Sequence, residues 1–217
     1  MIKIENYEVV GCEHALRGMR NPKNSWDRSD SGWRTDFEGG VYYEIGKYDR
    51  KLAMSLAEGG PVHAKYRRMI TVYVDITAPL YWWKEFDTYK VGVVANSCST
   101  MHKIHAKEFT MEDFSHEHLD EPDSPFYRHV IEAVIDGLNT ARELYLETKD
   151  KIYWWQMIQL LPSSYNQKRT VMLNYEVLTN IYRWRKDHKL DEWREFCEWI
   201  EKLPYSELIT GAVKEES

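Results

Sequence analysis

Short polar side chains gather in residues 95–100, which form a candidate site for an anion or a nucleobase. The possible hydrogen-bond donors of this run are Asn96, Ser97, Ser99 and Thr100, with Lys90 and Lys103 on either side. Donors of this kind stabilise phosphate or carbonyl oxygens without any special fold. The same residue types also cap helices, so a capped helix start is the structural alternative.

Cys98 lies inside the same run and is a candidate nucleophile. The nearest residues that could act as its base are His102 and His105. A lone cysteine is more commonly a small buried apolar residue. The other two cysteines, Cys12 and Cys197, are distant and show no CxxC spacing, which favours a reducing compartment.

Four histidines are candidate zinc ligands, because imidazoles two or three positions apart can converge on one metal ion. They are His102, His105, His116 and His118. No cysteine flanks them and the HExxH motif is absent. Surface histidines beside an acidic loop are the simpler interpretation, and no metal is expected.

A cluster of basic residues lies between two predicted helices near the C-terminus. Its members are Arg183, Arg185, Lys186, His188 and Lys189. Arg185 offers a bidentate guanidinium that suits a phosphate. The alternative is a basic helix end that complements the helix dipole.

A strand and several helices are predicted to position these side chains. Residues 69–77 alternate between apolar and polar types, with the period of a half-buried strand. Ser124-Pro125 and the apolar spacing after it predict an amphipathic helix of about 25 residues. The other predictions are a strand over residues 2–11, helices over 14–20, 48–58, 80–89, 171–185 and 187–203, a surface loop over 18–40 and an acidic loop over 107–123. This order indicates an α+β fold.

Length and composition bound the organisation of the chain. With 217 residues and no visible linker, a single domain is expected over residues 1–210, followed by a flexible tail at 211–217. The hydrophobic content of 43% is enough for a core. A net charge of −6 argues against nucleic acid as a partner. No apolar run reaches the length of a membrane span, so no membrane association and a cytoplasmic location are expected.

Two blocks of the sequence resemble one enzyme family. The C-terminal block comprises Leu160-Leu161-Pro162, Asn174, Asn180, Arg185, His188 and Glu192. The middle block comprises Gly59-Gly60-Pro61-Val62-His63, the alternating strand, Ala78-Pro79 and Asn96-x-x-Ser99. Their order and spacing resemble the flavin-dependent thymidylate synthases over roughly residues 48–105 and 155–203.

The resemblance implies a fold, a reaction and an assembly. The fold would be that of the family, with a central antiparallel or mixed sheet and long helices. The reaction would be the methylation of dUMP to dTMP by an enzyme that uses FAD, with methylenetetrahydrofolate as the one-carbon donor and NADPH as the reductant. Family members are homotetramers with active sites at subunit interfaces, so a homo-oligomer is expected.

The resemblance also implies roles for individual residues. Ser99 would be catalytic and line the pyrimidine near its reacting carbons, and Arg185 would hold the dUMP phosphate. Thr100 would be a further substrate-binding residue. The residues expected to contact the flavin or to form its pocket are His63, Lys90, Asn96, Asn174, Asn180 and His188. Trp82 and Trp83 are either stacking platforms or core residues.

The sequence departs from the family signature, which is written RHRxxSxNxxSxR. Only Asn96 and Ser99 match it. Tyr89, Lys90 and Val91 stand where the family has two arginines and a histidine, and Met101 replaces the last arginine. Candidates to replace the lost phosphate contacts are Lys84, Lys90, His102 and Lys103.

Three alternatives to a thymidylate synthase therefore stay open. The first is a nucleotide-binding relative that has lost the flavin chemistry. The second is a related enzyme that modifies C5 of a pyrimidine nucleotide. The third is a metal-dependent hydrolase that uses the four histidines.

Overall fold

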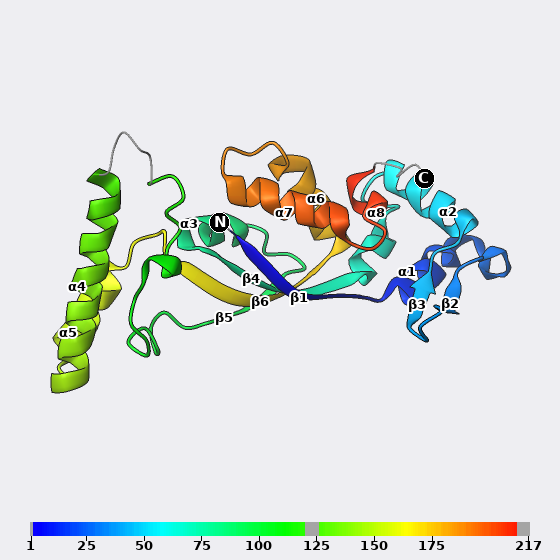
Figure 1. Ribbon diagram of the computed structural model, residues 1–217. Coiled ribbons are helices and arrows are strands. Elements are labelled where there is room, and N and C mark those ends of the chain that lie inside the picture. Colours follow the sequence, from blue (N-terminus) through cyan, green and yellow to red (C-terminus); the bar gives the residue numbers. More distant parts are fainter. Residues whose placement is uncertain (1, 120–125, 212–217) are drawn as a thin grey trace. The chain divides into compact units, whose positions relative to one another are not determined.

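The computed structural model describes residues 2–119 and 126–211 (Figure 1). The strands are β1 (Lys3–Val10), β2 (Gly32–Thr35), β3 (Val41–Glu44), β4 (Thr71–Pro79), β5 (Val94–Ser97) and β6 (Asn166–Asn174). The helices are α1 (Cys12–Met19), α2 (Lys47–Glu58), α3 (Leu80–Phe86), α4 (Phe126–Thr148), α5 (Lys151–Leu160), α6 (Tyr175–Arg185), α7 (Asp191–Lys202) and α8 (Glu207–Thr210). The fold is α+β, as the sequence predicted.

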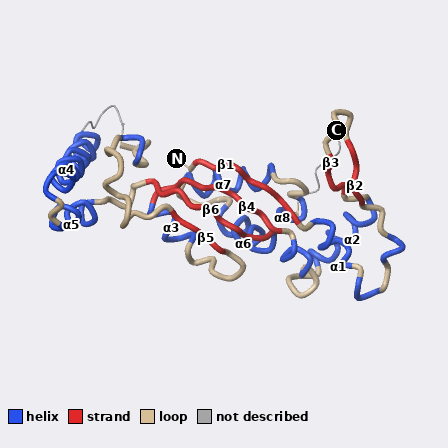
Figure 2. The backbone as a smooth tube through the Cα atoms, turned by 90° about the horizontal axis from the view of Figure 1, so that it is seen from below, coloured by secondary structure: helices blue, strands red, loops and turns tan. Residues whose placement is uncertain are grey.

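The strands form one larger sheet and one hairpin. In the four-stranded sheet the order is β1-β4-β6-β5 (Figure 2). Strand β4 confirms the predicted alternation, because Val72, Val74 and Ile76 are buried and Tyr73 is exposed. Strands β2 and β3 pair antiparallel, with Gly32 opposite Glu44. Strand β5 carries the polar run, which therefore starts on an extended segment rather than on a helix.

The chain divides into two compact units. Unit 1 contains residues 1–4, 75–88 and 96–170, and unit 2 contains residues 5–74, 89–95 and 171–217. The single domain expected over residues 1–210 stays a prediction. Of the expected tail, residues 212–217 lie outside the described residues.

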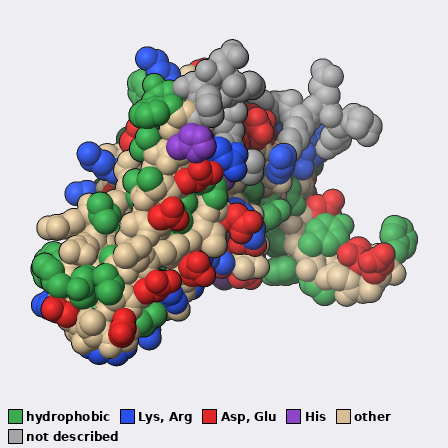
Figure 3. Space-filling view, turned by 60° about the vertical axis from the view of Figure 1, so that its left-hand side comes forward, with side chains coloured by type: hydrophobic (Ala, Val, Ile, Leu, Met, Phe, Trp, Pro, Cys, Tyr) green, Lys and Arg blue, Asp and Glu red, His purple; other side chains and the backbone are tan. Residues whose placement is uncertain are grey.

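Unit 1 is built around helices α4 and α5, which lie side by side in Figures 1 and 2. Their core consists of Ile104, Phe109, Phe114, Ile131, Ile135, Leu138, Ala141 and Met157. The amphipathic helix is thus confirmed from Phe126 onward, whereas Ser124-Pro125 lies outside the described residues. Figure 3 shows further hydrophobic side chains at the surface on this side, and those of Phe126, Trp155 and Leu160 are exposed.

Helix α3 contributes a cluster of packed aromatic rings to unit 1. Trp82, Trp83 and Phe86 are buried, with ring centroids 4.9–5.3 Å apart. The indole Nε1 of Trp83 donates to the carbonyl oxygen of Gln167 at 2.8 Å. Trp82 and Trp83 are therefore core residues, and no stacking platform for a ligand is needed to explain them.

Several predicted boundaries were wrong. Residues 18–40 are not one loop, since β2 and the turn to β3 lie within them. Residues 171–174 belong to β6, so the helix predicted over 171–185 begins only at Tyr175. Helix α5 was missed because its residues are apolar on several faces and show no helical period. The helix predicted over 187–203 begins at Asp191. Among the described residues, no helix combines the length and apolarity that a bilayer span requires.

Candidate functional site

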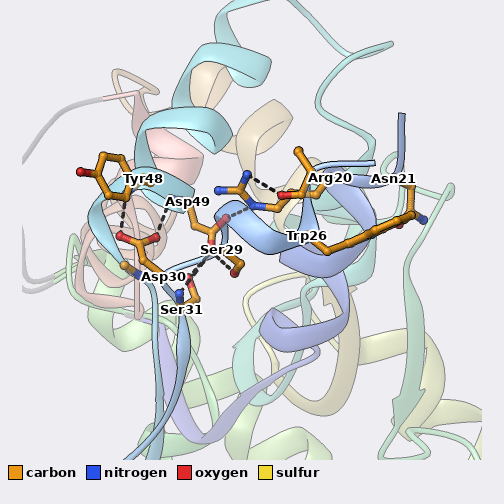
Figure 4. A network of polar contacts seen from close by, with 10 residues as sticks. Arg20, Asn21, Trp26, Ser29, Asp30, Ser31, Tyr48 and Asp49 are labelled. Atoms are coloured by element: carbon orange, nitrogen blue, oxygen red, sulfur yellow. Dashed lines mark hydrogen bonds and ion pairs between the residues drawn. The ribbon is translucent and has the colours of Figure 1, made fainter. Parts of the chain in front are cut away.

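A buried carboxylate lies at the centre of a network of polar contacts in unit 2. Asp49, on the first turn of α2, has no exposed surface. It accepts hydrogen bonds from Arg20 Nε at 2.5 Å, Ser29 Oγ at 2.5 Å and Ser31 Oγ at 2.6 Å. Figure 4 shows these side chains pointing toward it. One carboxylate thereby ties both ends of the irregular segment 20–31 to α2.

The pKa of Asp49 follows from this environment. Burial raises the pKa of the carboxyl, but the hydrogen bonds from Ser29, Ser31 and Arg20 and the positive charge of Arg20 lower it by more. The net pKa lies below the ordinary value of an aspartate. Asp49 is therefore an anion that compensates the buried Arg20 guanidinium, which is 4% exposed.

A second carboxylate fixes the start of α2. Asp30 accepts hydrogen bonds from the backbone N–H groups of Tyr48 at 2.8 Å and Asp49 at 3.0 Å. These N–H groups have no partner inside the helix, so Asp30 caps it and also complements its dipole. Gly46 permits the close approach, since a Cβ there would lie 2.2 Å from the Asp30 side chain.

The segment 20–31 forms one wall of a cavity of about 1470 Å³ in unit 2. Other walls come from α2, through Tyr48, Leu52 and Leu56, and from residues 62–69. The apolar lining residues are Met19, Leu52, Leu56, Val62, Tyr66 and Met69, and the basic ones are Arg20, Lys23, Arg28, His63 and Lys65. The cavity thus combines a broad apolar surface with cationic groups, which suits an amphipathic anion.

Of the predicted cofactor residues, His63 lines this cavity. It follows α2 and is exposed. The sequence did not identify residues 18–30 as cavity wall. Their only signal was length, because long loops are more often functional than merely connecting.

The polar run with the predicted catalytic serine belongs to unit 1. Ser99 Oγ accepts hydrogen bonds from the backbone N–H groups of Met101 at 3.2 Å and His102 at 2.9 Å. A serine hydroxyl that accepts two bonds still carries its own proton and can donate it to a third group. Asn96 is exposed and Thr100 is half-buried. The run is therefore ordered around Ser99 and accessible along most of its length.

Strand β6 anchors the same run. The backbone N–H of Cys98 donates to the carbonyl oxygen of Lys168 at 2.9 Å, and Gln167 Nε2 donates to the carbonyl oxygen of Cys98 at 2.8 Å. The thiol of Cys98 is free and exposed, so it is not the buried apolar residue that a lone cysteine commonly is. Burial raises the pKa of Cys12 to about 11 and that of Cys197 to about 12.

Arg185 and His188 are brought together at the end of α6, within unit 2. Arg185 Nε donates to Tyr89 Oη at 3.1 Å, and Arg185 Nη1 lies 2.9 Å from His188 Nε2. The guanidinium carbon also lies 4.7 Å from the ring centroid of Trp193. These contacts hold the guanidinium in one orientation. The Leu190 N–H approaches His188 Nδ1 at 3.2 Å, and a neutral imidazole can accept only one of the two donors at a time.

The other predicted cofactor residues of unit 2 are more scattered. Asn174 is the N-cap of α6, and its Oδ1 accepts from Val177 N at 3.1 Å. Asn180 and Lys90 are exposed. Gly92, with φ of 80°, packs against Asn174, since a Cβ there would lie 2.9 Å from Asn174 Nδ2. Within the part of the chain that the structure describes, His63 is the one predicted site residue that lines the cavity.

The histidines proposed as zinc ligands find no support as a cluster. Within residues 2–119 and 126–211, no group of three or more His, Cys, Asp or Glu side chains is arranged to hold a metal ion. His116 Nδ1 instead contacts the carbonyl oxygen of Phe114 at 2.9 Å, and the His105 ring packs against Tyr145.

Comparisons with known proteins give a result only at the level of structure. No family model and no curated protein sequence matches the chain. A crystal structure of the flavin-dependent thymidylate synthase ThyX from Helicobacter pylori, complexed with FAD and dUMP, matches with a TM-score of 0.66 and 17% identity. The match covers 98% of this chain and 99% of the other. A second structure of that enzyme with FAD and dUMP matches at a TM-score of 0.65 and 17% identity, over 97% of both chains. At this identity the likeness concerns the fold, and the chain has the fold of the flavin-dependent thymidylate synthases.

Proposed function

We propose that this protein is a divergent flavin-dependent thymidylate synthase that methylates dUMP to dTMP. The observation that carries the proposal is the match over nearly the whole chain to structures that contain FAD and dUMP. The proposed one-carbon donor is methylenetetrahydrofolate and the proposed reductant is NADPH. The proposed assembly is a homotetramer in the cytoplasm.

The cavity of unit 2 is the proposed site for FAD. Its volume of about 1470 Å³ exceeds the ~300–1,000 Å³ of common ligand sites, so a dinucleotide can enter it. His63 lines it, and the apolar residues of α2 offer a surface for a planar ring. When bound, a reduced flavin supplies the hydride and carries the one-carbon unit, so the protein is left to position and polarise the substrate.

Further residues, which do not line the cavity as the described residues form it, are proposed from the resemblance to contact the flavin across a subunit interface of the homotetramer. They are Lys90, Asn96, Asn174, Asn180 and His188. Asn174 would act through its side-chain Nδ2 or its backbone, because its side-chain oxygen already caps α6. His188 would act together with Arg185, which it contacts.

Arg185, Ser99 and Thr100 are the proposed substrate-binding residues. The guanidinium of Arg185 is held by Tyr89 and Trp193, and this preorganisation suits a bidentate phosphate contact. Ser99 would act as the catalytic group, and its hydroxyl would donate a hydrogen bond to a carbonyl oxygen of the pyrimidine. Such a donor withdraws electron density and stabilises charge that develops on the ring during methylation at C5.

The decisive experiment measures binding before turnover. Purified protein is titrated with FAD while flavin fluorescence is followed, and then supplied with dUMP, methylenetetrahydrofolate and NADPH while dTMP is quantified. Flavin binding together with dTMP formation is the expected result. Rescue of a thymidine-requiring bacterium by the gene checks the same activity in cells.

Variants separate the proposed roles. Arg185→Ala should weaken dUMP binding more than FAD binding, whereas Arg183→Ala, on the exposed side of α6, is the matched control. Binding of dUMP without FAD binding would instead favour a nucleotide-binding relative, for which Val91 and Met101 at the signature positions already argue. A different product formed at C5 would favour a related pyrimidine-modifying enzyme. A protein that binds neither ligand refutes the proposal.

A further inference from the structure

The cavity of unit 2 carries more positive charge than its surroundings neutralise. Lys23, Arg28 and Lys65 line it, and within the part of the chain that the structure describes they form no ion pair. Arg20 also lines the cavity, but the buried carboxylate of Asp49 compensates it. Three cations therefore remain to attract an anion.

Two carboxylates on the same wall, Asp27 and Asp30, repel an anion to different degrees. Asp30 is bound to the start of α2, where two N–H groups and the helix dipole offset its charge. Asp27 lines the cavity without such compensation among the described contacts. Asp27 is therefore the group that limits the affinity for an anion.

The cations and the apolar surface come from different parts of the wall. Lys23 and Arg28 belong to the segment 20–31, which Asp49 ties to α2, and Lys65 belongs to residues 62–69. Leu52 and Leu56 supply an apolar surface from α2. Tyr48 lines the same side and is 69% exposed. A ligand that satisfies both parts has a planar aromatic ring and a multiply charged anionic group.

We propose that Lys23, Arg28 and Lys65 bind the diphosphate of a dinucleotide in this cavity. The inference rests on the proposed function where the dinucleotide is FAD. It assigns two of the three diphosphate contacts, Lys23 and Arg28, to a segment that the sequence presented only as a surface loop. Guanidinium and ammonium groups form charge-assisted hydrogen bonds with phosphate oxygens. The Asp49 network holds the backbone of the segment 20–31 on the wall through Arg20, Ser29 and Ser31, so the ligand has to order only the side chains of Lys23 and Arg28.

Calorimetry with three probes tests the inference: FAD, riboflavin (which has no phosphate) and inorganic pyrophosphate. The test variant is Lys23→Ala/Arg28→Ala/Lys65→Ala. The control is Arg17→Ala/Lys47→Ala/Lys51→Ala, which removes the same charge from exposed positions that do not line the cavity. A charged hydrogen bond changes an affinity by about tenfold or more. The test variant loses three such groups and should therefore bind FAD about a thousandfold more weakly than the wild type, with riboflavin unchanged and with the control close to the wild type.

Each outcome decides between the inference and the broader function. Equal FAD affinities for the wild type and the test variant overturn the inference, while leaving a flavoprotein. Equal affinities for FAD and riboflavin overturn it as well. If no flavin binds, the proposed function fails. The inference is still supported in that case if the wild type and the control bind pyrophosphate and the test variant does not. Absence of pyrophosphate binding in that case overturns both. Asp27→Asn should strengthen FAD binding, and weaker binding in this variant would contradict the charge argument.

Discussion

Replacing Asp49 by asparagine should destabilise the protein strongly, because it leaves Arg20 buried without a counter-charge. The side chains of Asp49 and Arg20 are 0% and 5% exposed, and Arg20 Nε lies 2.5 Å from Asp49 Oδ1. Breaking a buried ion pair on one side costs about 3–5 kcal/mol. Asparagine keeps the volume and one acceptor oxygen, so the loss should fall near the lower end, about 3 kcal/mol. For a chain of this size that lowers Tm by roughly 6–12 °C.

The assay is thermal and urea denaturation, combined with limited trypsin digestion. Trypsin should cleave the variant faster after Lys23 and Arg28, since the segment 20–31 loses its anchor on α2. The control is Asp36→Asn, in which an exposed turn carboxylate that accepts from Glu38 N and Gly40 N is changed in the same way. Its loss should stay below about 1 kcal/mol.

A paired replacement decides whether charge is the cause. Arg20→Met/Asp49→Leu removes both charges, and a buried pair exchanged for apolar side chains often costs little. The double variant should therefore be more stable than Asp49→Asn alone. The reasoning is refuted if Asp49→Asn loses less than about 1 kcal/mol, or if the double variant is the less stable one.

Three further predictions concern pH, backbone and thiols. Because folding lowers the pKa of Asp49, its carboxylate stabilises the folded state above the ordinary aspartate pKa of about 3.9. This stabilisation is lost as the pH falls through the lower pKa of the folded state. The urea midpoint should therefore depend less on acid pH in Asp49→Asn than in the wild type. Gly11→Ala should lower the free energy of unfolding by more than about 2 kcal/mol, because φ is 91° and a Cβ would lie 2.3 Å from the Met69 carbonyl oxygen. Gly60 has a similar φ of 89° but open space around it, so Gly60→Ala should lower the free energy of unfolding by about 1 kcal/mol in the same urea assay. In the native protein, one thiol should react fast with a disulfide reagent, and this fast reaction should be absent in Cys98→Ser. The reason is that Cys98 is exposed, whereas burial raises the pKa values of Cys12 and Cys197. Three fast thiols would contradict this expectation.

The parts of the fold that obey a local period were predictable from the sequence. Strand β4 alternates strictly, and the inward positions Val72, Val74 and Ile76 are all buried. Helix α4 likewise follows from its three-and-four spacing. In both elements one face is buried and the other exposed, so the pattern of residue types reports the structure directly.

The candidate site was only partly predictable, because its contacts link residues that are distant in sequence. Asp49 receives Ser29 and Ser31 from 18–20 positions earlier, and nothing local marks it as a buried acceptor. The assignment of Asn174 to a flavin rests on resemblance and stays a prediction, and its role as the cap of α6 was not foreseen. Strand β6 was obscured because its first half is polar, with Lys168 and Arg169 bound to Asp75 and Asp87. Long-range partners of this kind are invisible to a window that moves along the chain.

The hairpin formed by β2 and β3 offers a place to attach a probe to unit 2. Its tip closes through Asp36 N–H donating to the Gly40 carbonyl oxygen, and Phe37 is fully exposed there. The tip does not line the cavity, and small exposed turns tolerate inserted residues well. A fluorophore or an epitope joined at position 37 should therefore leave ligand recognition intact, while reporting on the adjoining segment 20–31 in real time.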